Sequence, residues 1–234
     1  MKKIINLKNT KIIILAVALI VFVGLIIDVR NFSLEPVEQL RVVEKEKGVK
    51  IIAFGDSLTA GYGLIISESY PSQLESNLRL QGLNVTVINS GVSGETTRGN
   101  LERAEFIRNQ KPDIVLLGIG GNDALRLLPV EETKNNIEST IQILQSGENP
   151  PIIILLKMQA PINVGTDYKE SFDMIYQELA TKYNLLLLPF MTSEVFLDSE
   201  NKLPDGIHLN KKGYEKVVNL YLADKISEII REKF

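Results

Sequence analysis

The sequence predicts an α/β domain in which helices cover both faces of a parallel sheet. Five short apolar segments alternate along the chain with segments whose apolar residues recur at helical spacing. The short segments are apolar almost throughout, rather than at every second residue, which is typical of strands buried on both faces. The length of 234 residues suits one such domain and is short for two.

The elements follow one another in a regular order. The expected strands are rich in isoleucine, leucine and valine, and they span residues 49–54, 85–88, 113–119, 151–156 and 185–188. The expected helices have apolar residues three or four positions apart, and they span residues 70–80, 97–109, 131–145, 168–183 and 211–230. Pro71 suits the first turn of the first helix.

The first residues differ in composition from this domain. Lys2, Lys3, Lys8 and Lys11 open the chain without an acidic residue, and residues 12–27 carry no charge. A basic segment before an apolar run is typical of a secretory signal or a signal anchor. This apolar run is shorter than the ~20 residues of a full span, but tilt and bilayer thinning accommodate the difference.

The pattern favours an uncleaved anchor over a cleaved signal. The small residues of a cleavage site should follow the apolar run, whereas the one such pair, Ala16 and Ala18, lies inside it. A buried core helix would leave the basic cluster unexplained. We therefore expect a signal anchor over residues 1–28, a polar linker over 29–48 and a globular domain over 49–234. The positive-inside rule then places the domain outside the cytoplasmic membrane, in the periplasm or the extracellular space.

Composition and missing motifs exclude several classes of function. The net charge of −3 gives no basic field for nucleic acid. The chain has no cysteine, which excludes disulfides and thiol nucleophiles, and its single histidine makes a zinc hydrolase site unexpected. The segment Gly118-Ile119-Gly120-Gly121 lacks the third glycine of a dinucleotide-binding loop. We expect neither a cofactor nor a metal ion.

Four polar motifs stand where a parallel sheet would carry a functional site. Gly55-Asp56-Ser57-Leu58, Asn89-Ser90-Gly91 and Gly120-Gly121-Asn122-Asp123 follow the first three expected strands, and Asp205-Gly206-Ile207-His208 precedes the last helix. In such sheets, functional groups gather in the loops beyond the carboxyl ends of the strands. We therefore expect these motifs to meet at one end of the sheet.

Ser57, His208 and Asp205 are the candidates for a nucleophile, its base and an orienting acid. A serine hydroxyl is a poor nucleophile until a base takes its proton, and imidazole suits that task near neutral pH. Since the chain has one histidine, such a base must be His208. Asp205 stands three residues earlier, where a turn eased by Gly206 can fold its carboxylate back to the ring.

Hydrogen-bond donors for a developing oxyanion can come from the same motifs. The candidates are the backbone amide of Gly91, the side-chain carboxamide of Asn122 and the backbone N–H of Ser57. We expect Asp56 and Asp123 to brace their loops by hydrogen bonds. Taken singly, each motif also has an ordinary interpretation as a surface histidine, a helix cap or a turn.

In combination, the motifs resemble the SGNH (GDSL) hydrolase family. Ser57 lies in a Gly-Asp-Ser-Leu block, Gly91 in the second block, Asn122 in a Gly-x-Asn-Asp block, and Asp205 and His208 in an Asp-x-x-His block. The resemblance covers residues 50 to about 225. More narrowly, residues 55–62, 188–190, 194–195 and 205–208 are similar to the thioesterase I, lysophospholipase and arylesterase group.

The resemblance implies a fold and a mechanism. The fold is a flavodoxin-like three-layer α/β/α sandwich with a five-stranded parallel sheet. The mechanism is that of a serine hydrolase without a metal or cofactor, with Ser57, His208 and Asp205 as its triad. The implied oxyanion hole consists of Ser57, Gly91 and Asn122.

The resemblance also implies the class of substrate. The group acts on small acyl esters, acyl-CoA thioesters and lysophospholipids. Leu125, Leu127 and Leu128 correspond in position to a mobile loop that lines the acyl site in that group. Ordinary packing against the core is the alternative role for these leucines.

Two other functions remain open at this point. A carbohydrate O-acetylesterase acting on envelope polysaccharide would use the same blocks, although the leucines of residues 125–128 favour longer acyl chains. A tethered binding protein without catalysis is the third possibility, and the intact set of site residues argues against it. We expect a monomer that contacts the membrane through its anchor.

Overall fold

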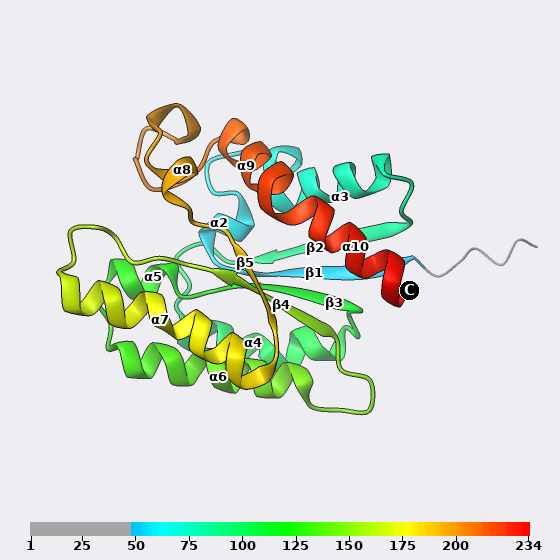
Figure 1. The fold of residues 1–234 in the computed structure, drawn as a ribbon, viewed down its shortest axis with the longest axis horizontal. Coiled ribbons are helices and arrows are strands. Elements are labelled where there is room, and N and C mark those ends of the chain that lie inside the picture. The colour runs from blue at the N-terminus through cyan, green and yellow to red at the C-terminus, as the bar shows by residue number, and fades with distance from the viewer. Residues whose placement is uncertain (1–47) are drawn as a thin grey trace, which may run out of the picture. The chain divides into compact units, whose positions relative to one another are not determined.

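The computed structural model describes residues 48–234, in which five parallel strands form one sheet (Figure 1). The strands are β1 (Val49–Gly55), β2 (Val85–Gly91), β3 (Ile114–Gly118), β4 (Ile152–Lys157) and β5 (Leu186–Pro189). Their order across the sheet is β2-β1-β3-β4-β5, and every neighbouring pair is parallel. This order is that of the flavodoxin-like fold, so the predicted fold class is confirmed.

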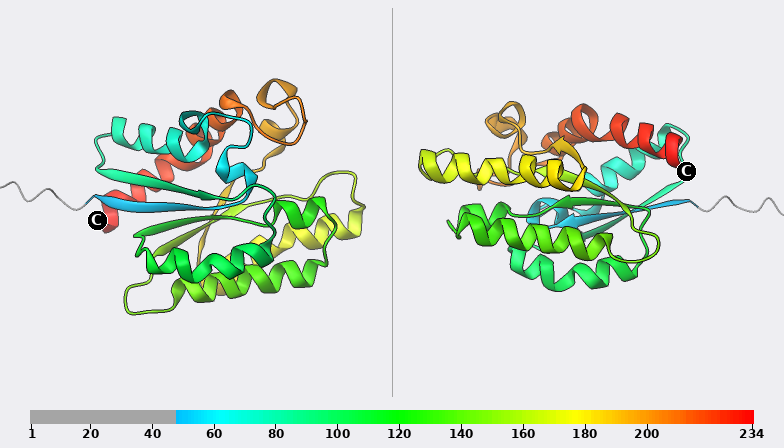
Figure 2. Two further views of the ribbon diagram at one scale, coloured as in Figure 1. Left: turned by 180° about the vertical axis from the view of Figure 1, so that it is seen from behind. Right: turned by 60° about the horizontal axis from the view of Figure 1, so that its bottom comes forward.

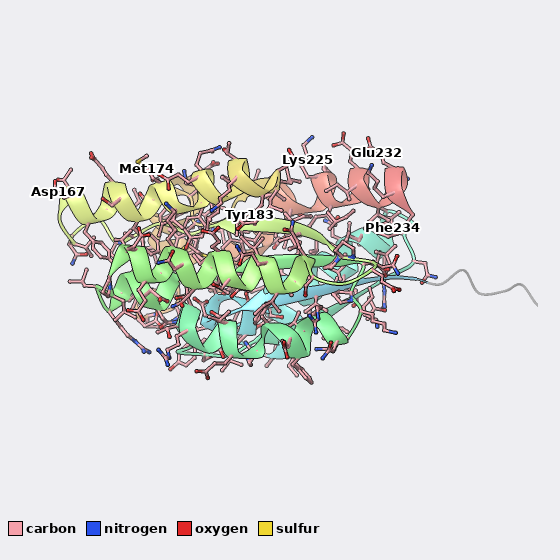
Figure 3. All side chains as sticks on the ribbon, turned by 90° about the horizontal axis from the view of Figure 1, so that it is seen from below. Asp167, Met174, Tyr183, Lys225, Glu232 and Phe234 are labelled. Atoms are coloured by element: carbon pink, nitrogen blue, oxygen red, sulfur yellow. The ribbon has the colours of Figure 1, made fainter. Side chains whose placement is uncertain are left out.

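Helices cover both faces of the sheet and complete three layers. They are α2 (Ser57–Ala60), α3 (Tyr70–Leu80), α4 (Thr97–Asn109), α5 (Gly121–Leu125), α6 (Val130–Gln145), α7 (Thr166–Tyr183), α8 (Ser193–Phe196), α9 (Lys211–Val217) and α10 (Ala223–Lys233). Short 3-10 turns occupy Ile66–Glu68 and Ser199–Asn201. Helices α3, α9 and α10 lie on one face, and α4, α6 and α7 lie on the other (Figures 1 and 2). Figure 3, which labels Asp167 and Tyr183 near the two ends of α7, shows this second helical layer from outside.

The core lies on both faces of the central strands. Every residue of β3 is buried, as are Ile51, Ile52, Ala53 and Phe54 of β1. Edge strand β5 is less covered, and Leu186 is exposed there. The uninterrupted apolar runs therefore mark the strands that have neighbours on both sides.

Two elements differ from the sequence-based expectation. Strand β2 continues to Gly91 instead of ending at residue 88, because its last three residues pair through their backbones with Ala53, Phe54 and Gly55 of β1. The single helix expected over 211–230 is divided by a π-helical turn at Val218–Leu222. Three further helices, α2, α5 and α8, have four or five residues and are too short to produce an apolar repeat.

The sheet has two distinct ends. The carboxyl ends of β1, β2 and β3 lead into the polar motifs at one end, near α2 and α5. Strand β1 begins at the opposite end, where the C-terminal residue Phe234 also lies (Figures 1 and 3). The anchor expected over 1–28 and nearly all of the linker expected over 29–48 fall outside the described residues. Within residues 48–234, none of the helices combines the length and apolarity that a membrane span requires.

Candidate active site

The serine stands at a sharp junction between the sheet and a short helix. Strand β1 ends at Gly55, and helix α2 begins two residues later with Ser57. Asp56 caps this helix, because its Oδ1 atom accepts a hydrogen bond of 3.0 Å from the N–H of Leu58. The N–H of Ser57 has no hydrogen-bond partner among residues 48–234 and is available to a ligand.

The histidine stands on an irregular loop that folds back on itself. Lys202 pairs with Leu209 in an isolated antiparallel bridge, and the N–H of Leu203 donates to the carbonyl of His208 at 2.8 Å. Gly206 has a φ of +70° at the turn between them. This left-handed conformation suits glycine and agrees with the turn that the sequence predicts.

Asp205 accepts three hydrogen bonds within this loop. Its Oδ1 accepts from the backbone N–H groups of Ile207 (2.9 Å) and His208 (3.0 Å), and its Oδ2 lies 2.7 Å from Nδ1 of His208. Partial burial acts to raise the pKa of this carboxyl group. The hydrogen bonds from His208 and Ile207 outweigh it and hold the pKa at about 2. Asp205 is therefore an anion at neutral pH.

These side chains meet although 151 positions separate the serine from the histidine in the chain. The Nε2 atom of His208 lies 2.8 Å from Oγ of Ser57. Because Nδ1 faces the anionic Asp205, the tautomer with the proton on Nδ1 fits best and leaves Nε2 free to accept the serine proton. The arrangement can abstract a proton from Ser57 and hold the resulting imidazolium.

Tyr62 is a site residue to which sequence reasoning assigned no role. Its ring packs on the imidazole of His208 with centroids 4.6 Å apart and planes tilted by 35°. Gly61, with a φ of +74°, ends helix α2 and turns the chain toward Tyr62. The spacing of five residues from Ser57 is the only trace of this contact in the sequence.

Asn122 lies at the start of α5 and lines the same cavity as Ser57. Its Nδ2 donates to the carbonyl of Glu95 at 3.0 Å. Since a carboxamide nitrogen carries two N–H groups, one remains for a ligand. The position agrees with a donor at the expected oxyanion site.

Gly91, the glycine expected as an oxyanion donor, is the last residue of β2. Its N–H already donates to Oδ1 of Asn89 at 3.0 Å, so this amide is engaged within the end of β2. A Cβ at this position would lie 2.2 Å from the backbone nitrogen of Ala60. The glycine is therefore needed for close packing of β2 against α2.

Gly94 is the glycine whose amide is free in this segment. It has a φ of +82° in a turn closed by the hydrogen bond from the N–H of Glu95 to the carbonyl of Val92 (3.2 Å). Its carbonyl accepts from Arg126 at 2.7 Å, and the next carbonyl, that of Glu95, accepts from Asn122. Within the described residues its N–H has no partner. A second glycine three residues after Gly91 was the sequence signal that could have found it.

An ion pair between Arg103 and Glu95 braces the turn that carries Gly94. The guanidinium group of Arg103 donates to both carboxylate oxygens of Glu95, at 2.8 and 2.5 Å, and to the carbonyl of Ser90. The same group lies 4.9 Å from the ring centroid of Phe54 in β1. This fixed ion pair joins the turn to helix α4 and the sheet.

Asp56 and Asp123 brace their segments, as the sequence predicted. Oxygen atoms of Asp123 accept from the N–H (2.9 Å) and the hydroxyl (2.6 Å) of Thr97, which ties α5 to α4. Both carboxyl groups are almost fully buried, at 1% and 2% exposure. Burial raises the pKa of Asp123 and raises that of Asp56 to about 6.

A cavity of about 660 Å³ opens beside Ser57 and is lined mainly by apolar side chains. Its lining includes Leu125, Leu127 and Ile162, all exposed, together with Phe196 and Leu197. Sequence reasoning expected Leu125, Leu127 and Leu128 here, and it missed the segments 159–164 and 191–197. Leu128 does not line the cavity; it is partly buried, and its carbonyl accepts from the hydroxyl of Tyr168 at 2.9 Å.

The chain is similar to proteins of known activity. The GDSL-like Lipase/Acylhydrolase family matches residues 53–216. The chain is 37% identical to an arylesterase from Vibrio mimicus over 161 residues, which cover 68% of this chain and 79% of the relative. It is 32% identical to thioesterase 1/protease 1/lysophospholipase L1 from Escherichia coli (strain K12) over 181 residues, which cover 77% and 84% of the two chains.

A solved structure has the same fold. AlinE4, an esterase of the SGNH-hydrolase family, is 39% identical and superposes with a TM-score of 0.64, covering 78% of this chain and 97% of that chain.

Proposed function

The chain belongs to the GDSL-like lipase/acylhydrolase family and is a carboxylic ester hydrolase, and we propose that Ser57, His208 and Asp205 are its catalytic triad. The observation that supports this assignment is a pair of hydrogen bonds that connect the three side chains in series. Oγ of Ser57 lies 2.8 Å from Nε2 of His208, and Nδ1 of the same ring lies 2.7 Å from the carboxylate of Asp205. This is the geometry that a nucleophile, a base and an orienting acid require.

In the first half of the proposed reaction, the acyl group moves to the enzyme. His208 takes the hydroxyl proton as Ser57 Oγ forms a bond to the acyl carbon, and the acyl oxygen becomes an anion. The intermediate collapses as the bond to the leaving oxygen or sulfur breaks, and His208 returns the proton to that atom. Asp205 stabilises the imidazolium between these two steps.

In the second half, water releases the acyl group. The same base takes a proton from water, whose oxygen attacks the acyl carbon and displaces Ser57 Oγ. The proton returns to Ser57, and a free carboxylic acid leaves.

The oxyanion needs donors that are unoccupied in the free enzyme. We propose the N–H of Ser57, the second N–H of Asn122 Nδ2 and the N–H of Gly94. Gly94 takes the role expected of Gly91, because its amide is free and the Gly91 amide is bonded to Asn89. The hydrogen bond from Asn122 Nδ2 to the carbonyl of Glu95 links the Asn122 side chain to the turn that carries Gly94.

We propose medium or long acyl chains as the preferred substrates. The support is the apolar lining of the cavity, with Leu125 and Leu127 beside Asn122. Each methylene that enters such a cavity contributes roughly 0.8 kcal/mol, or about fourfold in kcat/KM, until the cavity is filled. A carbohydrate O-acetylesterase would gain nothing from this apolar wall.

The test is hydrolysis of a graded series from acetyl to palmitoyl, as nitrophenyl esters and as CoA thioesters. The full-length chain is compared with its Ser57→Ala variant. Activity that rises toward hexanoyl to dodecanoyl chains and disappears in the variant supports the proposal. Activity confined to acetyl would assign an acetylesterase, and tight binding of the series without Ser57-dependent turnover would assign a binding protein.

The location of the domain is a separate proposal. We propose that residues 1–28 anchor the chain to the cytoplasmic membrane and that residues 49–234 act outside it as a monomer. The basic and then apolar composition of the N-terminal segment supports this. Protease added to spheroplasts or protoplasts should remove the domain; protection of the domain until the cytoplasmic membrane is lysed would refute export.

A further inference from the structure

The loop that follows strand β4 supplies six consecutive residues of the cavity lining, 159–164. Strand β4 ends at Lys157 and helix α7 begins at Thr166, so the loop stands beyond the carboxyl end of a parallel strand, where such sheets carry functional groups. Ala160 is almost fully buried, at 4% exposure, whereas Ile162 is 80% exposed. The loop therefore has a buried residue and an exposed apolar residue two positions apart.

An ion pair on helix α7 holds both the N–H and the carbonyl of Ala160. Oδ1 of Asp173 accepts from the Ala160 N–H at 2.8 Å, and Nζ of Lys169 donates to the Ala160 carbonyl at 3.3 Å. The two side chains bond each other at 2.5 Å, one helical turn apart. Within the part of the chain that the structure describes, residues 159–164 make no other hydrogen bond. The position of the loop therefore depends on the Lys169–Asp173 pair.

The two members of this pair differ in their relation to the cavity. Lys169 lines it, whereas Asp173 does not. Their side chains are 29% and 23% exposed, so water screens the pair only in part. A substitution of Asp173 therefore releases the backbone of Ala160 without removing an atom from the cavity lining.

Ile162 has the most apolar surface to lose to a bound chain. Among the exposed apolar side chains of residues 48–234 that line the cavity, it has the largest exposed fraction. Apolar surface that a substrate covers is removed from water, which stabilises the complex. Since Ile162 stands two residues after Ala160, the Lys169–Asp173 pair fixes where this surface is presented.

From these contacts we propose that the Lys169–Asp173 pair sets how strongly the site selects long acyl chains, by fixing the loop that carries Ile162. The inference rests on the proposed function and adds residues that determine its specificity. Asp173 is a positioning residue, because it acts through Ala160 and not on the reacting atoms. Without the pair, the loop must be ordered each time a chain binds, and this entropic cost opposes only chains long enough to reach it.

The first measurement is hydrogen exchange of the loop in the full-length chain, read by mass spectrometry. Asp173→Ala removes the acceptor of the Ala160 N–H and breaks the ion pair, whereas Asp173→Asn keeps an oxygen for that N–H. Glu178→Ala is the matched control, since Glu178 is also on α7, pairs with Lys134 at 2.7 Å and does not line the cavity. Exchange over residues 159–164 should be fastest in Asp173→Ala, intermediate in Asp173→Asn and unchanged in Glu178→Ala. Unchanged exchange in Asp173→Ala would refute the role of the pair in fixing the loop.

The second measurement is kcat/KM over nitrophenyl esters from acetyl to dodecanoyl, so that the leaving group stays the same. We expect Asp173→Ala to lower kcat/KM about tenfold for the dodecanoyl ester, mainly through KM, and less than about twofold for the acetyl ester. Asp173→Asn should cause a smaller loss, and Glu178→Ala should cause none. A loss that is equal at every chain length, or absent at every length, would show that Asp173 does not determine specificity.

Ile162→Ala tests whether the pair acts through this side chain. The variant should cause a loss of kcat/KM that also grows with chain length, because it removes apolar contact surface from the cavity. If the pair positions Ile162, Asp173→Ala should add little to the loss that Ile162→Ala already causes on the dodecanoyl ester. Losses that are fully additive in the double variant would overturn the inference.

Failure of the proposed function is seen separately. It appears as absence of Ser57-dependent hydrolysis of the whole ester series by the wild-type chain. The hydrogen-exchange result does not depend on turnover, so it tests the hold of the Lys169–Asp173 pair on the loop in either case.

Discussion

The proposed nucleophile lies at the buried end of a strand, whereas its proposed base lies on a more exposed loop. Ser57 follows the fully buried end of strand β1 and is 9% exposed, and the neighbouring Asp56 is 1% exposed. His208 and Asp205 stand on a loop without regular structure, with side chains 15% and 35% exposed. Hydrogen bonds within the loop and the Ser57 contact hold the base side, whereas the sheet holds the nucleophile side.

This difference separates stability from catalysis. Substitutions on the loop remove few buried contacts, so they should lower turnover while leaving the fold intact. Substitutions beside Ser57 alter packed or desolvated groups and should change the free energy of unfolding as well.

The largest effect is expected on the loop side. His208→Ala removes the only histidine and should lower kcat/KM by roughly 10³-fold or more, because the serine loses its base. The urea midpoint of unfolding should stay close to that of the wild type. Since the triad acts as a unit, the Ser57→Ala/His208→Ala double variant should be little slower than either single variant. Additive losses would contradict the assigned roles.

Asn122→Ala should lower kcat by about 10²–10³-fold by removing one oxyanion donor. Asn122 also bonds the carbonyl of Glu95, so part of the loss could come from the turn that carries Gly94. Arg103→Lys is the control, since it weakens the bracing of the same turn without touching Asn122. An equal loss of kcat in both variants would assign Asn122 to support of the turn alone.

On the sheet side of the site, ionisation of Asp56 should make the free energy of unfolding depend on pH. Its pKa in the fold is about 6, against an ordinary 3.8, so the folded protein binds this proton more tightly than the unfolded chain does. The stabilisation of the fold by the proton on Asp56 is fully present below pH 3.8 and is lost as the pH rises through about 6. The free energy of unfolding changes by at most about 3 kcal/mol over this range. Asp56→Asn removes this ionisation and keeps an oxygen for the N–H of Leu58.

The measurement compares urea unfolding of the wild type and Asp56→Asn at about pH 4.5 and about pH 7.5. The stability of Asp56→Asn relative to the wild type should increase at the higher pH. Asp167→Asn, which changes an exposed carboxyl group on α7, should show no such trend. A constant difference between wild type and Asp56→Asn would mean that Asp56 does not titrate in this range.

The smallest effect is expected at Tyr62. Its ring covers the imidazole and should stabilise the imidazolium that forms during catalysis, as an exposed cation–π pair does, by about 0.5–1 kcal/mol. Tyr62→Leu should therefore lower kcat about two- to fivefold, and Tyr62→Phe should restore it. If Phe and Leu were equally impaired, the hydroxyl group and not the ring face would matter.

The sequence predicted the features that depend on local pattern. Strands β1 and β3 were recognisable because residues buried on both faces are apolar without interruption. The pairing of His208 with Asp205 was recognisable because three residues and a glycine define one turn. The single histidine of the chain then indicated Ser57 as its partner from 151 residues away.

The missed features depend on which groups are already occupied in three dimensions. Gly91 and Gly94 are both glycines after β2, and only the structure shows that Asn89 occupies the first amide. The ring contact of Tyr62 and the lining residues within 191–197 come from segments that meet only after folding. Leu128 has the same side chain as its neighbours but a different orientation, which a residue type cannot reveal.

The two ends of the sheet have a practical consequence for handling this domain as a catalyst. Strand β1 begins at the end of the sheet remote from Ser57, and the chain ends there at Phe234 (Figure 1). A solid support or a fused protein joined at either end would therefore leave the cavity open to the solution. A short peptide linking the two ends would also permit a circular permutation, with new ends in the exposed segment around Gly147. Enzyme fixed to a surface in this way would present all its active sites outward.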